Sequence, residues 1–174
     1  MNKVVCNLLL LIISFSPLLS NAQPMDSLLV QLARKWTNAK EYTLQMVDLM
    51  PAENFSFKPV AEEMSFKEQL LHIAKNMQWL SSAYLDINGS NAITNDSLLD
   101  KAALIKILSD AYDQAMMGHH VDKKKLDEKV SFFSGPLTRR QILILMHDHQ
   151  THHVGQIIVY LRLKGIKPPA YVGW

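Results

Sequence analysis

One segment, between Thr138 and Gly165, carries the signals for both ends of a long helix. Thr138 followed three residues later by Gln141 is a capping box, in which each side chain bonds the backbone N–H of the other residue. Gly165 and the "KPP" sequence after it stop the helix, because proline cannot continue one. We therefore expect a helix of about 27 residues. A helix of this length requires partners of similar length, which favours a bundle.

Three earlier segments have the apolar spacing of amphipathic helices. They span approximately residues 27–50, 65–84 and 98–117. The second opens on another capping box, formed by Ser65 and Glu68. No convincing alternating strand pattern is present, and "KVSFF" at residues 129–133 is the nearest candidate. The sequence thus predicts an all-α protein, an antiparallel four-helix bundle, in a single domain that covers residues 23–174.

Residues 1–22 have the pattern of a signal peptide. Lys3 is followed by the apolar run "VVCNLLLLIISFSPLLS", and "SNA" supplies the small residues of a cleavage site before Gln23. The alternative is an N-terminal membrane anchor, because the apolar run approaches the roughly 18 residues that a spanning helix needs. We expect cleavage, an exported protein in the periplasm or outside the cell, and no stable membrane anchor. Cleavage also removes Cys6, the only cysteine of the chain.

The charge balance argues against a nucleic-acid partner. Removal of Lys3 leaves 17 Lys and Arg residues against 16 Asp and Glu residues. The densest charged run, "DKKKLDEK" at residues 122–129, mixes both signs. A surface that binds nucleic acid normally concentrates positive charge on one face. We therefore expect no nucleic-acid partner.

Four of the seven histidines lie in the stretch "HDHQTHHVGQ", residues 147–156, within the last helix. Successive helical residues are rotated by about 100°, so His149 and His153 share one face. The same face carries apolar Ile142, Leu145 and Tyr160. We expect this face to look into the bundle. His147 falls on the opposite side and is expected at the surface, whereas His152 lies at the margin.

A histidine pair spaced i, i+4 brings two imidazoles within reach of one ion. Two interior histidines with hydrogen-bond partners would give the same pattern, so the pair alone leaves both interpretations open. A metal would also need a third ligand from another helix. His72 is the candidate, on a polar stripe of the second helix together with Glu68 and Gln69. This stripe fits either a pocket wall or a solvated surface.

Two further histidines, His119 and His120, follow "MMG" at the end of the third helix. Histidine is favoured near a helix C-terminus by the helix macrodipole, without any metal. We therefore leave both outside the candidate site.

Three motifs lie on the second and fourth helices and in the chain that follows them: "LLHIAKNMQWL", "HQTHHVGQIIVYLR" and the trailing "LKGIKPPAY". Together they resemble the DinB-like family, and the resemblance extends from about Met25 to Tyr171. It implies a four-helix bundle that holds a divalent metal with His72, His149 and His153. Many relatives have arginine directly after the last ligand histidine, where this chain has Val154. A role for a cation at that position is therefore not carried over.

The resemblance also implies a reaction class. Some relatives are thiol S-transferases or isomerases, and others are described as metal-dependent hydrolases. Three neutral imidazoles leave the charge of a bound ion uncancelled and suit zinc, nickel, iron or manganese. Glu68, one turn before His72, is either a catalytic carboxylate or fully occupied by its capping box. Gln156 could orient a water or a ligand, and Asp148 is a weaker candidate.

The sequence thus predicts an exported protein that binds a divalent metal through three histidines. The expected activity is metal-dependent hydrolysis or thiol-dependent transfer on a small molecule. A non-catalytic metal-binding or interaction module of the same fold is the alternative, and a bundle with purely structural histidines is a third. Bundles of this kind commonly pair, so a homodimer is a further expectation.

Overall fold

The computed structural model describes residues 27–89 and 99–174, except for the side chains of Ser27, Leu28 and His119. Within these ranges it confirms the four predicted helices. They are α1 (Ser27–Leu49), α2 (Phe66–Tyr84), α3 (Lys101–Met116) and α4 (Arg139–Leu163). The predicted signal peptide, residues 1–22, lies outside the described part of the chain. Export and the expected homodimer remain predictions.

Short elements connect the helices. The described residues include the 3-10 turns η1 (Ala52–Asn54), η3 (Met117–His120) and η4 (Lys123–Lys125). A small hairpin precedes α4, in which β1 (Lys129–Val130) pairs antiparallel with β2 (Leu137–Thr138). The strand candidate at residues 129–133 therefore contributes two residues to a strand.

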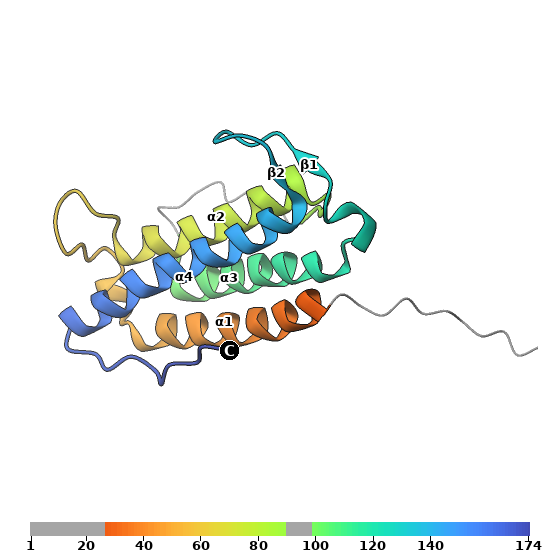
Figure 1. Ribbon diagram of the computed structural model, residues 1–174. Coiled ribbons are helices and arrows are strands. Elements are labelled where there is room, and N and C mark those ends of the chain that lie inside the picture. The colour runs from red at the N-terminus through yellow and green to blue at the C-terminus, as the bar shows by residue number, and fades with distance from the viewer. Residues whose placement is uncertain (1–26, 90–98) are drawn as a thin grey trace, which may run out of the picture.

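The helices form a closed four-membered bundle, in which α2 and α1 each pack against both α3 and α4. Figure 1 shows α1 and α4 running in one direction along the bundle, and α2 and α3 running in the other. The contacts of α2 with α4 and of α1 with α3 are therefore antiparallel. As a result α4 has a neighbouring helix on two sides, α2 on one and α1 on the other.

Both predicted capping boxes are present. The Ser65 hydroxyl accepts from the Glu68 backbone N–H at 3.2 Å, and the Ser65 N–H donates to the Glu68 carboxylate at 2.6 Å. Thr138 and Gln141 make the equivalent pair at the start of α4. At the far end of α4, Gly165 has φ +73°, a left-handed conformation that glycine adopts readily. The ends of α2 and α4 are thus set by local sequence.

Buried hydrogen bonds join three of the helices in the bundle interior. The Tyr112 hydroxyl lies 2.7 Å from the Thr43 hydroxyl and donates to Gln150 at 2.9 Å, so α1, α3 and α4 are joined by buried hydrogen bonds. Such groups are tolerated in a core because each has a partner. No helix in the described part of the chain combines the length and the apolar character that crossing a membrane requires.

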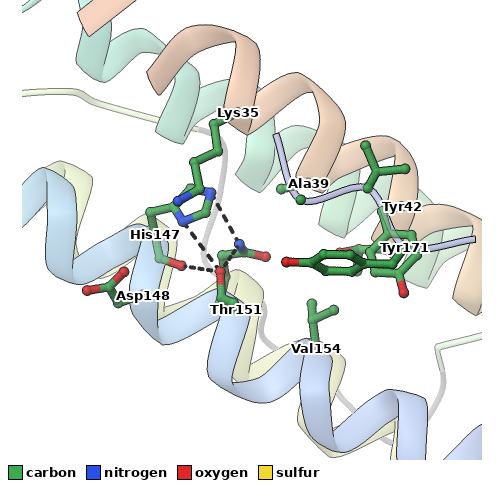
Figure 2. Close-up of a pocket in the computed structure, with 12 residues that line it drawn as sticks. Lys35, Ala39, Tyr42, His147, Asp148, Thr151, Val154 and Tyr171 are labelled. Atoms are coloured by element: carbon green, nitrogen blue, oxygen red, sulfur yellow. Dashed lines mark hydrogen bonds between the residues drawn. The ribbon is translucent and has the colours of Figure 1, made fainter. Parts of the chain in front are cut away.

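His147 is buried, and the prediction that it lies at the surface is wrong. Its side chain is 4% exposed, and its ring packs edge-on against Trp36 of α1 at 4.9 Å between ring centres. Figure 2 shows it beside Lys35 and Thr151. Burial, followed by the nearby Lys35 ammonium, lowers the pKa of His147 to about 4. The helical wheel assumed one interior face, whereas α4 is covered on two sides.

Candidate metal centre

Three histidines converge where α2 and α4 pack together. One ring nitrogen from each of His72, His149 and His153 lies within 4.8 Å of the others. The Nε2 atoms of His72 and His149 are 3.1 Å apart. Two nitrogens bound tetrahedrally to one zinc ion, each at about 2.0–2.1 Å, are about 3.3 Å apart. The structure therefore turns His72 toward the pair on α4, and the nitrogen spacing suits one small ion.

A buried glutamine, Gln69, determines which nitrogen His153 presents. The Tyr160 hydroxyl donates to the Met64 carbonyl at 2.7 Å, so it can only accept from the Gln69 amide N–H at 3.4 Å. The Gln69 Oε1 atom consequently faces His153 Nδ1, at 2.6 Å. An amide oxygen cannot donate, so Nδ1 carries the hydrogen and donates. The lone pair of His153 is thus on Nε2, which leaves this nitrogen able to bind an ion.

Gln156 belongs to the same hydrogen-bond network. Its Oε1 accepts from Gln69 Nε2, and its Nε2 lies 3.0 Å from Nε2 of His152. Gln156 therefore holds the side-chain amide of Gln69, which in turn orients His153. His152 is exposed and is not part of the three-histidine cluster. The sequence places Gln69 on the same helical stripe as His72, but no role was predicted for it. Its position three residues before His72 is the feature that could have indicated a role beside the histidines.

The environment keeps the clustered imidazoles neutral. Burial lowers the pKa of His72, and it lowers the pKa values of both His149 and His153 to about 4, with a further contribution from the neighbouring histidines. Neutral imidazole is the form that coordinates a metal. In addition, His149 Nδ1 is buried without a hydrogen-bond partner in the described structure. The donor set, its spacing and its protonation all fit a divalent ion.

Glu68 makes the interactions of the capping box. Its side chain is 52% exposed, and its carboxylate accepts from Ser65 and pairs with Lys58 at 3.2 Å. Hydrogen bonds from the Ser65 backbone and hydroxyl lower the pKa of Glu68 to about 2, with a smaller contribution from Lys58. A carboxylate held in this way stabilises the start of α2. Of the two roles that the sequence left open for Glu68, this is the one in which the capping box occupies the carboxylate.

Replacement of Glu68 by glutamine keeps the capping pattern but removes a negative charge at the start of α2, and it is expected to lower the free energy of unfolding by about 0.5–1 kcal/mol at pH 7. The folded pKa lies below the unfolded value of 4.5. The ionised group therefore stabilises the fold above pH 4.5, and this contribution is lost as the pH falls toward 2. Urea unfolding at pH 7, 5 and 3.5 should show the gap to wild type narrowing at the lowest pH. Glu63→Gln, in the exposed preceding loop, is the control; an equal gap at every pH would contradict the assignment.

A larger pocket opens beside the histidine cluster. It has a volume of about 460 Å³ and is bounded by α2, α4 and the loop that joins β1 to β2. Its walls are mostly apolar, and the side chains that line it include Trp79, Phe132, Phe133, Ile144 and Leu145. His149 lies on its wall, so the cluster and the pocket share a residue.

A smaller cavity, about 130 Å³, lies on the α1 side of α4 and is covered by residues 171–173. Figure 2 shows His147, Thr151 and Val154 from α4 facing it, together with Tyr171. None of the three clustered histidines lines this cavity. Val154, which directly follows His153, thus lies on the α1 side of α4.

Comparisons with known proteins agree with the fold and the motifs. The uncharacterized protein YjoA of Bacillus subtilis (strain 168) is 21% identical over 140 residues, which cover 78% of this chain and 90% of YjoA. The crystal structure of YjoA, a DinB-like protein, superposes with a TM-score of 0.66 over 81% of this chain and 96% of that one. A DinB-like protein from Bacillus cereus ATCC 10987 is 22% identical with a TM-score of 0.64, over 81% and 95% of the two chains. The model of the DinB family matches residues 22–173, nearly the whole length, and the chain therefore belongs to the DinB family.

Proposed function

We propose that this protein binds one divalent metal ion through His72, His149 and His153 and hydrolyses a small molecule. The observation that carries the proposal is the hydrogen bond from His153 Nδ1 to Gln69, which frees the other ring nitrogen beside His72 and His149. Hydrogen bonds of this kind, from the ring nitrogen that does not bind the ion, commonly orient metal-ligating histidines. The apolar pocket on the same wall supplies space for a substrate.

An ion bound by three neutral imidazoles would supply Lewis acidity, which polarises a carbonyl or phosphoryl oxygen and lowers the pKa of water toward about 7. The residues of the chain would orient the metal ligands and shape the substrate pocket. Gln69 holds the ring of His153, and Gln156 holds Gln69. The apolar walls would bind the non-reacting part of the substrate and limit access of water.

The proposal is tested with protein purified without a histidine tag and loaded separately with zinc, nickel, iron or manganese. We expect at least one metal to support release of p-nitrophenol from small uncharged aryl esters. Chelation and His149→Ala should each abolish this release, whereas Trp174→Ala, a change remote from the cluster, should leave it unaltered. Hydrolysis that persists in His149→Ala would contradict the proposal.

The same experiment separates the competing functions. Turnover that appears only after addition of a low-molecular-weight thiol would indicate a transferase instead of a hydrolase. Stoichiometric metal without turnover of any ester, with or without thiol, would indicate a metal-binding module. The hydrolase is favoured because the described residues that line the pocket include no lysine or arginine to bind an acidic thiol cosubstrate.

A further inference from the structure

The pocket beside the histidines exposes an unusual amount of aromatic surface. Phe133 is 83% exposed and Trp79 is 45% exposed, although both lie next to buried Phe132. The ring centres of Phe132 and Phe133 are 4.3 Å apart, and those of Trp79 and Phe132 are 5.9 Å apart. Large apolar side chains that gather at the mouth of a pocket indicate a binding surface, because their exposure is otherwise unfavourable.

Two of the pocket's residues also have polar atoms that lack a partner. Asn76 Oδ1 and His149 Nδ1 are both buried without a hydrogen bond within the described structure. A buried polar atom without a partner is destabilising, typically by the whole desolvation penalty of the group. Asn76 Oδ1 can only accept, so it would be satisfied by a ligand N–H or O–H. The pocket thus combines an apolar body with a small hydrogen-bonding end beside the metal centre.

The charge of the pocket restricts the ligand further. Apart from His149, Asp148 is the only ionisable residue among the described residues that line the pocket. Asp148 is exposed. In the protein without metal, an anionic ligand would meet this carboxylate, and no lysine or arginine among the described lining residues would compensate it. An uncharged ligand meets neither this repulsion nor that of a divalent ion at the histidines.

We propose that this pocket binds the aromatic or aliphatic body of an uncharged small molecule, which donates an N–H or O–H to Asn76 Oδ1 and offers an acceptor to His149 Nδ1. This inference deepens the proposed function, on which it rests, because it names the substrate class of the same site. A volume of about 460 Å³ is within the range of about 300–1,000 Å³ typical of small-molecule pockets.

Two fluorescent dyes that differ by one charged group test the proposal. N-phenyl-1-naphthylamine is uncharged, and 8-anilinonaphthalene-1-sulfonate has the same ring skeleton with an added sulfonate. In chelated protein, we expect the uncharged dye to bind saturably to one site and at least about tenfold more tightly than the anionic dye, because only the anionic dye has a sulfonate that Asp148 repels. Asp148→Asn should narrow this difference by strengthening the binding of the anionic dye.

A matched pair of variants locates the dye. Phe133→Ser should weaken binding of the uncharged dye by about tenfold, through loss of an exposed aromatic wall. Tyr171→Ser removes an aromatic side chain of similar exposure, 80%, from the other cavity and should leave binding unchanged. Neither side chain is part of the core, so both variants should fold. Equal affinity for both dyes, or an unchanged affinity in Phe133→Ser, would overturn the proposal.

Dye binding is measured in chelated and in metal-loaded protein, which keeps the two proposals distinguishable. If dye binding follows the expected pattern but no metal supports hydrolysis, the proposed function fails and the pocket assignment stands. If hydrolysis depends on metal but the dyes do not discriminate, only the substrate class fails.

Discussion

Protein purified with the change His153→Ala is expected to contain almost no metal, whereas the wild type retains close to one ion per chain after dialysis. His153 is the most buried member of the cluster, 8% exposed, and the ligand whose tautomer is held by Gln69. Two imidazoles alone leave an ion under-coordinated. We expect a loss of affinity exceeding about 100-fold, since even changes behind the ligands cost about 10–100-fold. Elemental analysis by mass spectrometry measures the metal content.

Two further variants show whether the effect is specific. His152→Ala should retain the metal, because His152 is the exposed neighbour outside the cluster. Gln69→Leu should weaken affinity by about 10–100-fold without abolishing binding, because it removes the acceptor that orients His153. Full metal content in His153→Ala, or loss in His152→Ala, would refute the assignment. His147→Ala is a poor control, since His147 is buried.

Replacement of Trp36 by alanine is expected to lower the free energy of unfolding by about 3–5 kcal/mol. Trp36 is 2% exposed and packs edge-on against Tyr112, at 5.9 Å between ring centres, and against His147. Its removal would leave a cavity between α1, α3 and α4 and would expose the imidazole of His147 to water. Urea unfolding, followed by circular dichroism, measures the loss.

Trp174→Ala provides a control with the same chemical change. Trp174 is 52% exposed, and the Lys35 ammonium lies over its ring, 5.1 Å from the ring centre. Such a contact at the surface contributes about 0.5–1 kcal/mol at most. We therefore expect a loss below about 1 kcal/mol for Trp174→Ala. A Trp36→Ala protein as stable as this control would show that α4 is not packed against α1 as described.

The helix ends and the histidine pair could be predicted because they depend on residues close in sequence. The capping boxes at Ser65 and Thr138 involve partners three positions away. His149 and His153 share a face because helical geometry alone sets their phase. The resemblance added His72, and the bundle then brought its ring to 3.1 Å from His149. None of these predictions required knowledge of which helices are neighbours.

The error at His147 and the missed role of Gln69 have a common origin. A helical wheel gives the direction of each side chain from its own helix, but not what lies in that direction. Trp36 covers His147 because α1 packs on the second side of α4. Gln69 meets His153 across a sequence separation of 84 residues, in the antiparallel contact of α2 with α4.

By itself, the sequence determined the helices, their ends, and the shared face of His149 and His153, because local hydrogen bonds and the helical repeat are complete within a few residues. Only the tertiary structure decided that His72 turns inward, that His147 is buried, and that Gln69 fixes the tautomer of His153. Each of these depends on contacts between helices, and such contacts are specified by the packing of the whole bundle.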